Sequence, residues 1–314
     1  MRRVFYNRFG GPEVLELEQF EPAQPGVGEV RLKVAGCGLN PIDYKTRLGL
    51  GFVSQQLRES FHFVPGYDVS GIVESLGEGV DRFWLGKPVF GMVNFPLGAG
   101  CYAESLVAPI AELQVTPTEL PLADAAALPL ASLTAWQALF DVGKLQRDER
   151  VLVLAGAGGV GHIATQLAHW KGAYVGATSS LKNHLFLRQC QVNLPIDYQE
   201  AANSGKNKSW DLIIDLMGGG IGEAALSLIS ENGRMVTVPT NTAEYLTAKG
   251  TQKGKTVLPM KVAPCGDQLK QIVELINSHK LNVTVSNRYS LDRVKEAQQA
   301  LEAGHVRGKL ILEL

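Results

Sequence analysis

The sequence has few cysteines and no pattern typical of a secreted protein. Its 314 residues include four cysteines, and no two of them form a C-x-x-C pair. This spacing excludes a disulfide framework and favours a reduced, cytoplasmic setting. The first residues, MRRVFYNRFGG, lack the apolar core of a signal peptide.

Neither sign of charge is in excess. Thirty Lys and Arg residues stand against 31 Asp and Glu residues, which gives a net charge of -1. This balance argues against partners such as nucleic acid or an anionic membrane surface. Residues 151–170 contain no charged side chain and are long enough for a membrane span. Four glycines at 156–161, followed by polar side chains, favour a turn and a helix instead. We therefore expect a small-molecule substrate, no nucleic acid and no membrane.

The chain is long enough for about two domains. Residues 1–120 contain short apolar runs, such as 29–35, 69–75 and 88–93, which predict a β-rich first domain. From residue 150 onward, apolar runs at 151–155, 173–178, 211–216 and 234–239 alternate with helical patterns. Alternation of this kind predicts an α/β fold with a doubly wound parallel sheet.

The end of the chain is predicted to rejoin the first domain. Apolar spacing predicts one helix around 269–276, capped by Asp267, and another over 291–303, ended by Gly304. The last run, KLILEL, reads as a strand. We therefore predict a discontinuous first domain over 1–122 and 265–314, and a nucleotide-binding domain over 123–264.

The strongest local signal is a complete G-x-G-x-x-G pattern between a predicted buried strand and an amphipathic helix. Its members are Gly156, Ala157, Gly158, Gly159, Val160 and Gly161. Glycines at these places allow a tight turn, a close approach of backbone to pyrophosphate, and packing of the helix on the strand. The helix N-terminus supplies free N–H groups for the phosphates. The pattern predicts dinucleotide binding, and His162 is expected to face either the phosphates or solvent.

The region after the second strand of this unit favours NADPH over NADH. An NAD site usually places an acid there, bonded to the ribose 2′-hydroxyl. No acid lies between Val175 and Ile196. Ser179, Ser180 and Lys182 lie there instead, and hydroxyls and an ammonium attract a 2′-phosphate. The alternative is that these residues cap the next helix in solvent.

These motifs resemble those of the zinc-free quinone oxidoreductases, the zeta-crystallin-like group of the medium-chain dehydrogenase/reductase superfamily. The similar segments are DERVLVLAGAGGVGHIATQLAH (148–169), GLNPIDYKTRLG (38–49), VPGYDVSGIV (64–73), AALPLASLTAWQAL (126–139) and GHVRGKLIL (304–312). His169 departs from the signature, which usually has Lys, Arg or Ser there. The resemblance implies a GroES-like catalytic domain, a Rossmann domain and reduction by NADPH.

The resemblance also implies further residues near the cofactor. Tyr198 matches a tyrosine near the 2′-phosphate, and Thr134 matches a position near the nicotinamide. Arg307 and Lys309 match a C-terminal R-G-K element that reaches the nucleotide or the domain cleft, with a solvated surface role as the alternative. Gly218 and Val238 complete the cofactor-binding candidates.

Zinc-dependent members of the superfamily carry a catalytic Cys and His where this chain has Asn40 and Tyr67. The residues present lack the Cys/His set that zinc requires, so no metal is expected. Without zinc to stabilise an alkoxide, hydride addition to a quinone or an α,β-unsaturated carbonyl is the favoured reaction, because such a substrate spreads its developing charge.

The candidate catalytic residues lie mostly in the segment NPIDYK and its surroundings. Asn40 is expected to donate its amide N–H to a substrate oxygen. Lys45 would bind the nicotinamide ribose or relay a proton, and Asp43 would orient Lys45 or hold the loop. Tyr67 is a further donor. Thr134 is placed near the nicotinamide, unless its hydroxyl bonds its own helix backbone.

Two other functions stay open from the sequence. One is an enoyl-thioester reductase on the same fold, and the other is a non-catalytic, crystallin-like protein that binds NADPH. The apolar segment TVLPMKV (256–262) is predicted to pair across a homodimer.

Overall fold

The computed structural model describes residues 1–57, 61–199 and 209–314, which divide into two compact units. Unit 1 comprises Met1–Leu133, Ala263–His279 and Val283–Leu314, and unit 2 comprises Thr134–Val262 and Lys280–Asn282. Residues 123–133, predicted to begin the second domain, thus belong to unit 1. They are held there because the Leu130 N–H donates to Asp68 Oδ1 at 2.7 Å. Gly36 and Gly38 lack the Cβ atoms that would collide with this segment's backbone.

Unit 1 is built on a seven-stranded sheet, as the β-rich N-terminal sequence predicts. Its order is β14-β15-β3-β4-β5-β7, with β6 paired to β3. The strands are β3 (Glu29–Gly38), β4 (Asp68–Leu76), β5 (Pro88–Met92), β6 (Ser105–Pro109), β7 (Leu113–Val115), β14 (Val285–Ser290) and β15 (Lys309–Glu313), and a separate ribbon joins β1 (Arg2–Phe5) to β2 (Glu16–Gln19). The antiparallel pairing of β15 with β3 confirms that the C-terminal strand returns to this unit.

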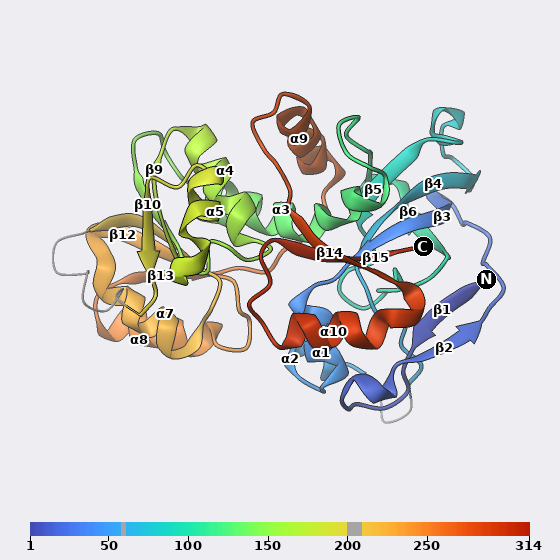
Figure 1. Cartoon of the computed structure of the whole chain (residues 1–314), viewed down its shortest axis with the longest axis horizontal. Coiled ribbons are helices and arrows are strands. Elements are labelled where there is room, and N and C mark those ends of the chain that lie inside the picture. The colour runs from blue at the N-terminus through green and yellow to red at the C-terminus, as the bar shows by residue number, and fades with distance from the viewer. Residues whose placement is uncertain (58–60, 200–208) are drawn as a thin grey trace. The chain divides into compact units, whose positions relative to one another are not determined.

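Short helices cover the sheet of unit 1. They are η1 (Pro12–Val14), α1 (Pro41–Arg47), α2 (Gly51–Ser54), η2 (Arg82–Trp84), η3 (Ile110–Glu112), η4 (Ala123–Ala127), α9 (Gly266–Asn277), η9 (Leu291–Arg293) and α10 (Val294–Glu302). Helices α1 and α10 lie side by side (Figure 1). The fully buried Arg47 joins them, because its guanidinium donates to Gln298 Oε1 and Glu302 Oε2, each at 2.7 Å.

Two predicted helix ends have different outcomes. Gly304 follows α10 with φ +76°, which confirms it as a left-handed terminator. The prediction that Asp267 caps α9 is wrong. Cys265 is the N-cap residue and Asp267 lies in the first turn, where its charge still favours the helix N-terminus.

Unit 2 is a parallel six-stranded sheet in the order β10-β9-β8-β11-β12-β13. Its strands are β8 (Arg150–Val153), β9 (Tyr174–Ser179), β10 (Leu194–Asp197), β11 (Trp210–Asp215), β12 (Ile229–Thr237) and β13 (Thr256–Pro259). Its helices are η5 (Gln137–Val142), α4 (Gly161–Lys171), η6 (Leu181–Asn183), α5 (His184–Gln189), α7 (Gly219–Ala225), η8 (Leu226–Leu228) and α8 (Ala243–Gln252), while α3 (Pro129–Trp136) crosses the division between the units. This alternation confirms the predicted Rossmann-like sheet.

The chain order reverses between β8 and β11, which is where ligands bind in sheets of this kind, outside the carboxyl ends of the strands. The apolar stretch 151–170 folds as β8, a turn and α4 rather than as one helix. Within the three described ranges, no helix has both the length and the apolar character needed to span a bilayer.

Candidate cofactor and substrate sites

The glycine-rich turn leaves the carboxyl end of β8 and enters α4. The neighbouring strand β9 holds it, because the Ala155 N–H donates to Thr178 Oγ1 at 3.0 Å and the Gly156 N–H donates to the Thr178 carbonyl at 2.8 Å. In this part of the chain, the N–H groups of Gly159 and Val160 have no acceptor within the described protein. These donors at the start of a helix suit the oxygens of a phosphate.

The three motif glycines meet different surroundings. A Cβ on Gly161 would collide with the Ala155 carbonyl, and one on Gly156 would lie 2.6 Å from the Ala177 Cβ. Packing therefore requires both glycines. A Cβ on Gly158 would meet only the Ala155 carbonyl, at an acceptable 3.4 Å. The protein itself does not require glycine at 158, and the open space there fits the backbone approach of a pyrophosphate.

His162 does not face the phosphates or solvent, so both expectations for it are wrong. Its side chain is fully buried, and Nδ1 lies 2.9 Å from the Gly158 carbonyl. The buried imidazole thus contacts the backbone of the glycine-rich turn and helps to hold its conformation.

The residues predicted to hold the 2′-phosphate come together at the carboxyl ends of β9 and β10. The Tyr198 N–H donates to the Ser179 carbonyl at 3.1 Å, which places the two residues side by side. Ser180 accepts a hydrogen bond from Asn183 Nδ2 at 3.3 Å and precedes η6, which carries the exposed Lys182. Tyr198 is 56% exposed. A hydroxyl, an ammonium and an exposed ring therefore border one edge of the sheet.

Gly218 and Val238 lie at the same edge, after β11 and β12. Asp215, which the sequence analysis did not single out, organises this region. Its buried carboxylate accepts from the Gly218 N–H and from the Thr237 hydroxyl, each at 2.8 Å, and its carbonyl accepts from the Val238 N–H at 3.0 Å. An acid that ends an apolar strand, as in DLIID, is the signal that could have indicated it.

Unit 1 contains a buried polar cluster around Asn40. Lys309 Nζ donates to Asn40 Oδ1 at 2.5 Å and to the Leu39 carbonyl at 2.7 Å, and it lies 3.6 Å from Asp68 Oδ2. The Asn40 amide N–H groups donate to Asp68 Oδ2 at 2.8 Å and to the Gly38 carbonyl at 3.4 Å. Burial raises the pKa of Asp68 and lowers that of Lys309, so each group relies on the other to stay charged.

This cluster bears on two predictions. Lys309 is 3% exposed and its ammonium is bound within unit 1, so the alternative of a solvated surface role is wrong. Asn40 is 2% exposed, and both of its amide N–H groups already have acceptors, so the structure does not leave it free to donate to a substrate. Arg307, by contrast, is exposed.

Asp43 holds the start of α1 rather than orienting Lys45. Its Oδ2 accepts from the Asn40 N–H at 2.8 Å and from the Tyr102 hydroxyl at 2.9 Å. Burial, opposed only in part by these hydrogen bonds, raises the pKa of Asp43 to about 7. Tyr102 thus belongs to the local framework, although the sequence analysis did not identify it.

The other candidate side chains differ in what they leave free. Tyr67 is buried and its hydroxyl donates to the Pro96 carbonyl at 2.9 Å, so this donor is already used. Lys45 is half-buried, and its ammonium has no partner among the described residues. Burial lowers the pKa of Lys45. The Thr134 hydroxyl is buried with no hydrogen-bond partner in the described part of the protein, which contradicts a bond to its own helix.

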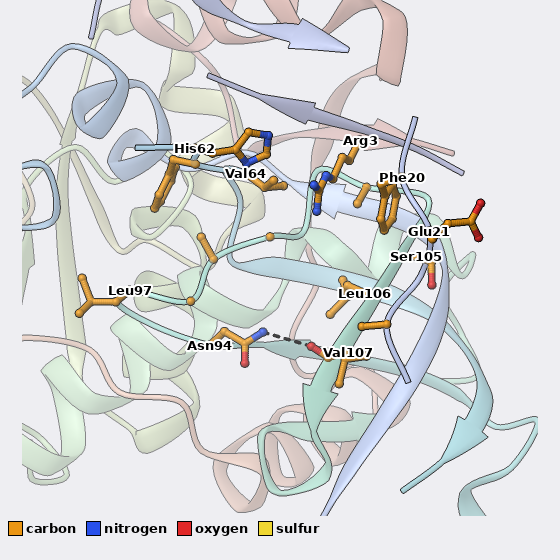
Figure 2. A pocket seen from close by; sticks show the side chains of 16 residues that line it. Arg3, Phe20, Glu21, His62, Val64, Asn94, Leu97, Ser105, Leu106 and Val107 are labelled. Carbon is orange, nitrogen blue, oxygen red and sulfur yellow. Dashed lines mark hydrogen bonds between the residues drawn. The ribbon is translucent and has the colours of Figure 1, made fainter. Parts of the chain in front are cut away.

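A hollow of about 390 Å³ in unit 1 lies away from these candidates. Figure 2 shows Arg3, Phe20 and His62 on one side and Asn94 and Leu97 on the other. None of the predicted catalytic residues lines it, so we do not assign the substrate to this hollow. Asn94 and residues 97–100 border it.

The described residues contain no group of three or more His, Cys, Asp or Glu side chains placed to hold a metal ion. At the position of the zinc-binding cysteine in zinc-dependent members, Asn40 instead contacts the Lys309 ammonium. A cation bound at that place would face a positive charge, so this environment does not fit zinc.

Comparisons with known proteins agree with this architecture. The family model described as "Alcohol dehydrogenase GroES-like domain" matches residues 26–118, and the one described as "Zinc-binding dehydrogenase" matches residues 192–312. A chloroplast envelope quinone oxidoreductase homolog of Arabidopsis thaliana is 32% identical over 100% of this chain and 98% of its own. An NADPH-dependent alkenal/one oxidoreductase of the same plant is 32% identical over 99% of this chain and 79% of its own.

A solved structure gives the same result. The quinone oxidoreductase of Coxiella burnetii superimposes with a TM-score of 0.95 and 36% identity, over 100% of this chain and 99% of its own. Together with the glycine-rich turn and the environment of Asn40, these similarities show that the chain belongs to the zinc-free quinone oxidoreductase group of the medium-chain dehydrogenase/reductase superfamily.

Proposed function

We propose that the protein is an NADPH-dependent oxidoreductase that reduces quinones or α,β-unsaturated carbonyls without zinc. The observation that carries this proposal is the sheet edge where the glycine-rich turn lies next to Ser179, Ser180 and Lys182, with no acid at the usual ribose position. The relatives named as quinone and alkenal/one oxidoreductases support the same reaction.

The cofactor would lie along this edge of unit 2. Residues 156–161 would bind its pyrophosphate, and Ser179, Ser180, Lys182 and Tyr198 would bind the 2′-phosphate end. Gly218 and Val238 would border the middle of the molecule. The Thr134 hydroxyl, which has no hydrogen-bond partner among the described residues, would form a hydrogen bond with the nicotinamide. When bound, NADPH supplies a hydride.

Among the candidate donors of unit 1, Lys45 is the one that the described residues leave free to assist the reaction. As hydride reaches a quinone or enone, negative charge develops on the substrate oxygen, and a nearby ammonium stabilises it. Because burial lowers the pKa of Lys45, its ammonium also gives up a proton more readily. Asn40, bound on both sides by Lys309 and Asp68, acts as a positioning residue at the start of α1.

A comparison of turnover on three substrates separates this proposal from the enoyl-thioester reductase and the non-catalytic protein. NADPH consumption should be faster with 9,10-phenanthrenequinone or 2-hexenal than with crotonyl-CoA. A preference for crotonyl-CoA would establish an enoyl-thioester reductase. Tight NADPH binding without turnover on any of the three would establish a non-catalytic protein.

The role of Lys45 has its own test. Lys45→Met should lower kcat by about 10²-fold or more, as expected for loss of a proton donor, with little change in the affinity for NADPH. The control is Lys33→Met, an exposed lysine of unit 1 that should leave both unchanged. Full activity in Lys45→Met would remove Lys45 from the mechanism.

The assembly and compartment belong to the same proposal. Strand β13 is the edge of the unit 2 sheet, so its free side can pair with a second copy to form a homodimer. A single species of monomer mass in light scattering at micromolar concentration would refute the dimer. Cys37, Cys101 and Cys190 are buried as free thiols, which suits a reduced compartment such as the cytoplasm.

A further inference from the structure

A hollow lined by aromatic side chains lies in unit 2, at the end of the sheet opposite the one that carries the glycine-rich turn. Residues 144–146 precede β8, and Trp170 and Lys171 end α4 before β9, so the hollow borders the amino ends of these strands. The glycine-rich turn borders their carboxyl ends. The hollow measures about 290 Å³ and is lined by Trp136, Phe140, Lys144, Leu145, Gln146, Trp170 and Lys171.

Three rings form its apolar wall. The ring centroids of Trp136 and Phe140 are 4.8 Å apart, and each lies 6.2 Å from the centroid of Trp170. Trp170 is nevertheless 41% exposed, so much of its indole has no protein cover. An exposed indole beside two further rings offers a flat surface for stacking, which favours another planar ring.

Two cations complete the hollow. Lys144 and Lys171 are exposed, and neither ammonium has an ion pair, a hydrogen bond or an aromatic face among the described residues. The backbone of Lys144 has φ +51°, a conformation that glycine or asparagine would adopt at lower cost. The turn conformation therefore gives no reason for a lysine at this position. Two unpaired ammonium groups next to a flat apolar wall complement a ligand that is both planar and anionic.

We propose that this hollow is a second ligand site, separate from the proposed cofactor site, which binds a planar aromatic acid. The ring of the ligand stacks on Trp170, and its carboxylate lies within reach of Lys144 and Lys171. The hollow is near the lower limit of ordinary small-molecule sites, so it suits a ligand of one or two fused rings.

The test uses the full chain saturated with NADP⁺, so that the cofactor site is filled. The probe is 2-naphthoate, compared with 2-naphthylmethanol, which is planar but neutral, and cyclohexanecarboxylate, which is anionic but not planar. The indole N–H signals of the four tryptophans, assigned from single Trp→Phe variants, report where each probe binds. We expect 2-naphthoate to bind more tightly than either comparison compound and to shift the signals of Trp136 and Trp170 but not of Trp84 and Trp210.

Variants separate stacking from charge. Trp170→Ala should weaken the binding of 2-naphthoate about tenfold, as expected for the loss of one stacked ring. The pair Lys144→Met and Lys171→Met should weaken it about fivefold and leave 2-naphthylmethanol unchanged. The pair Lys270→Met and Lys280→Met removes the same charge from exposed lysines elsewhere and should change neither.

Three results would overturn the proposal. They are failure of the NADP⁺-saturated chain to bind 2-naphthoate, signal changes confined to other tryptophans, and equal losses in the two lysine pairs.

Discussion

Replacing Lys309 by Met should strongly destabilise unit 1. Methionine keeps an unbranched stem of similar length but removes the ammonium that donates to Leu39 and Asn40 and neutralises Asp68. Lys309 and Asp68 are both almost fully buried, so solvent cannot replace the lost partner. Breaking a buried charge pair by removing one member costs about 3–5 kcal/mol. We expect the free energy of unfolding of unit 1 to fall by that amount.

Urea unfolding can follow this unit separately. Trp84 lies in unit 1, whereas Trp136, Trp170 and Trp210 lie in unit 2, so a protein with phenylalanine at the latter three positions reports on unit 1 alone. The control is Lys45→Met, which removes a half-buried ammonium without a partner and should change the stability by less than about 1 kcal/mol. Equal losses in the two variants would refute the assignment of Lys309 to a buried charge pair.

Further predictions concern the cofactor turn, its specificity and pH. Gly158→Ala should fold as stably as the parent but bind NADPH at least about tenfold more weakly. Gly161→Ala should instead lose stability, because its Cβ would collide with the Ala155 carbonyl. Equal melting temperatures for the two variants would contradict this difference. Lys182→Glu should weaken the binding of NADPH about tenfold or more and change the binding of NADH little. Equal losses of affinity for the two cofactors in calorimetry would exclude Lys182 from the phosphate site. The pKa of Asp43 is about 7 in the folded protein and about 4 when unfolded, so the folded state binds the extra proton and stability falls as pH rises between these values. Asp43→Asn should reduce that slope in urea midpoints, and an unchanged slope would assign it to other groups.

Local patterns predicted the parts of the fold that depend on neighbours in sequence. The run before Gly156 is a buried strand, the helix after it begins at Gly161, and Gly304 ends α10 as expected. Short-range periodicity and turn chemistry determine these features, so one sequence is enough to predict them.

The environment of the polar side chains could not be predicted in the same way. Lys309 meets Asn40 and Asp68 only because β15 pairs with β3, across most of the chain length. Likewise, the donors of Asn40 and Tyr67 have acceptors that no local pattern indicates. Long-range packing decides whether a polar side chain is available for catalysis, and it leaves Lys45 free instead.

The central claim is that unit 2 binds a cofactor phosphorylated on its adenosine ribose. Titration calorimetry of the full chain with NADPH and with NADH tests it directly. The account predicts NADPH binding tighter by about tenfold or more, since a charged 2′-phosphate gains hydroxyl and ammonium partners. Equal affinities, or tighter binding of NADH, would contradict it.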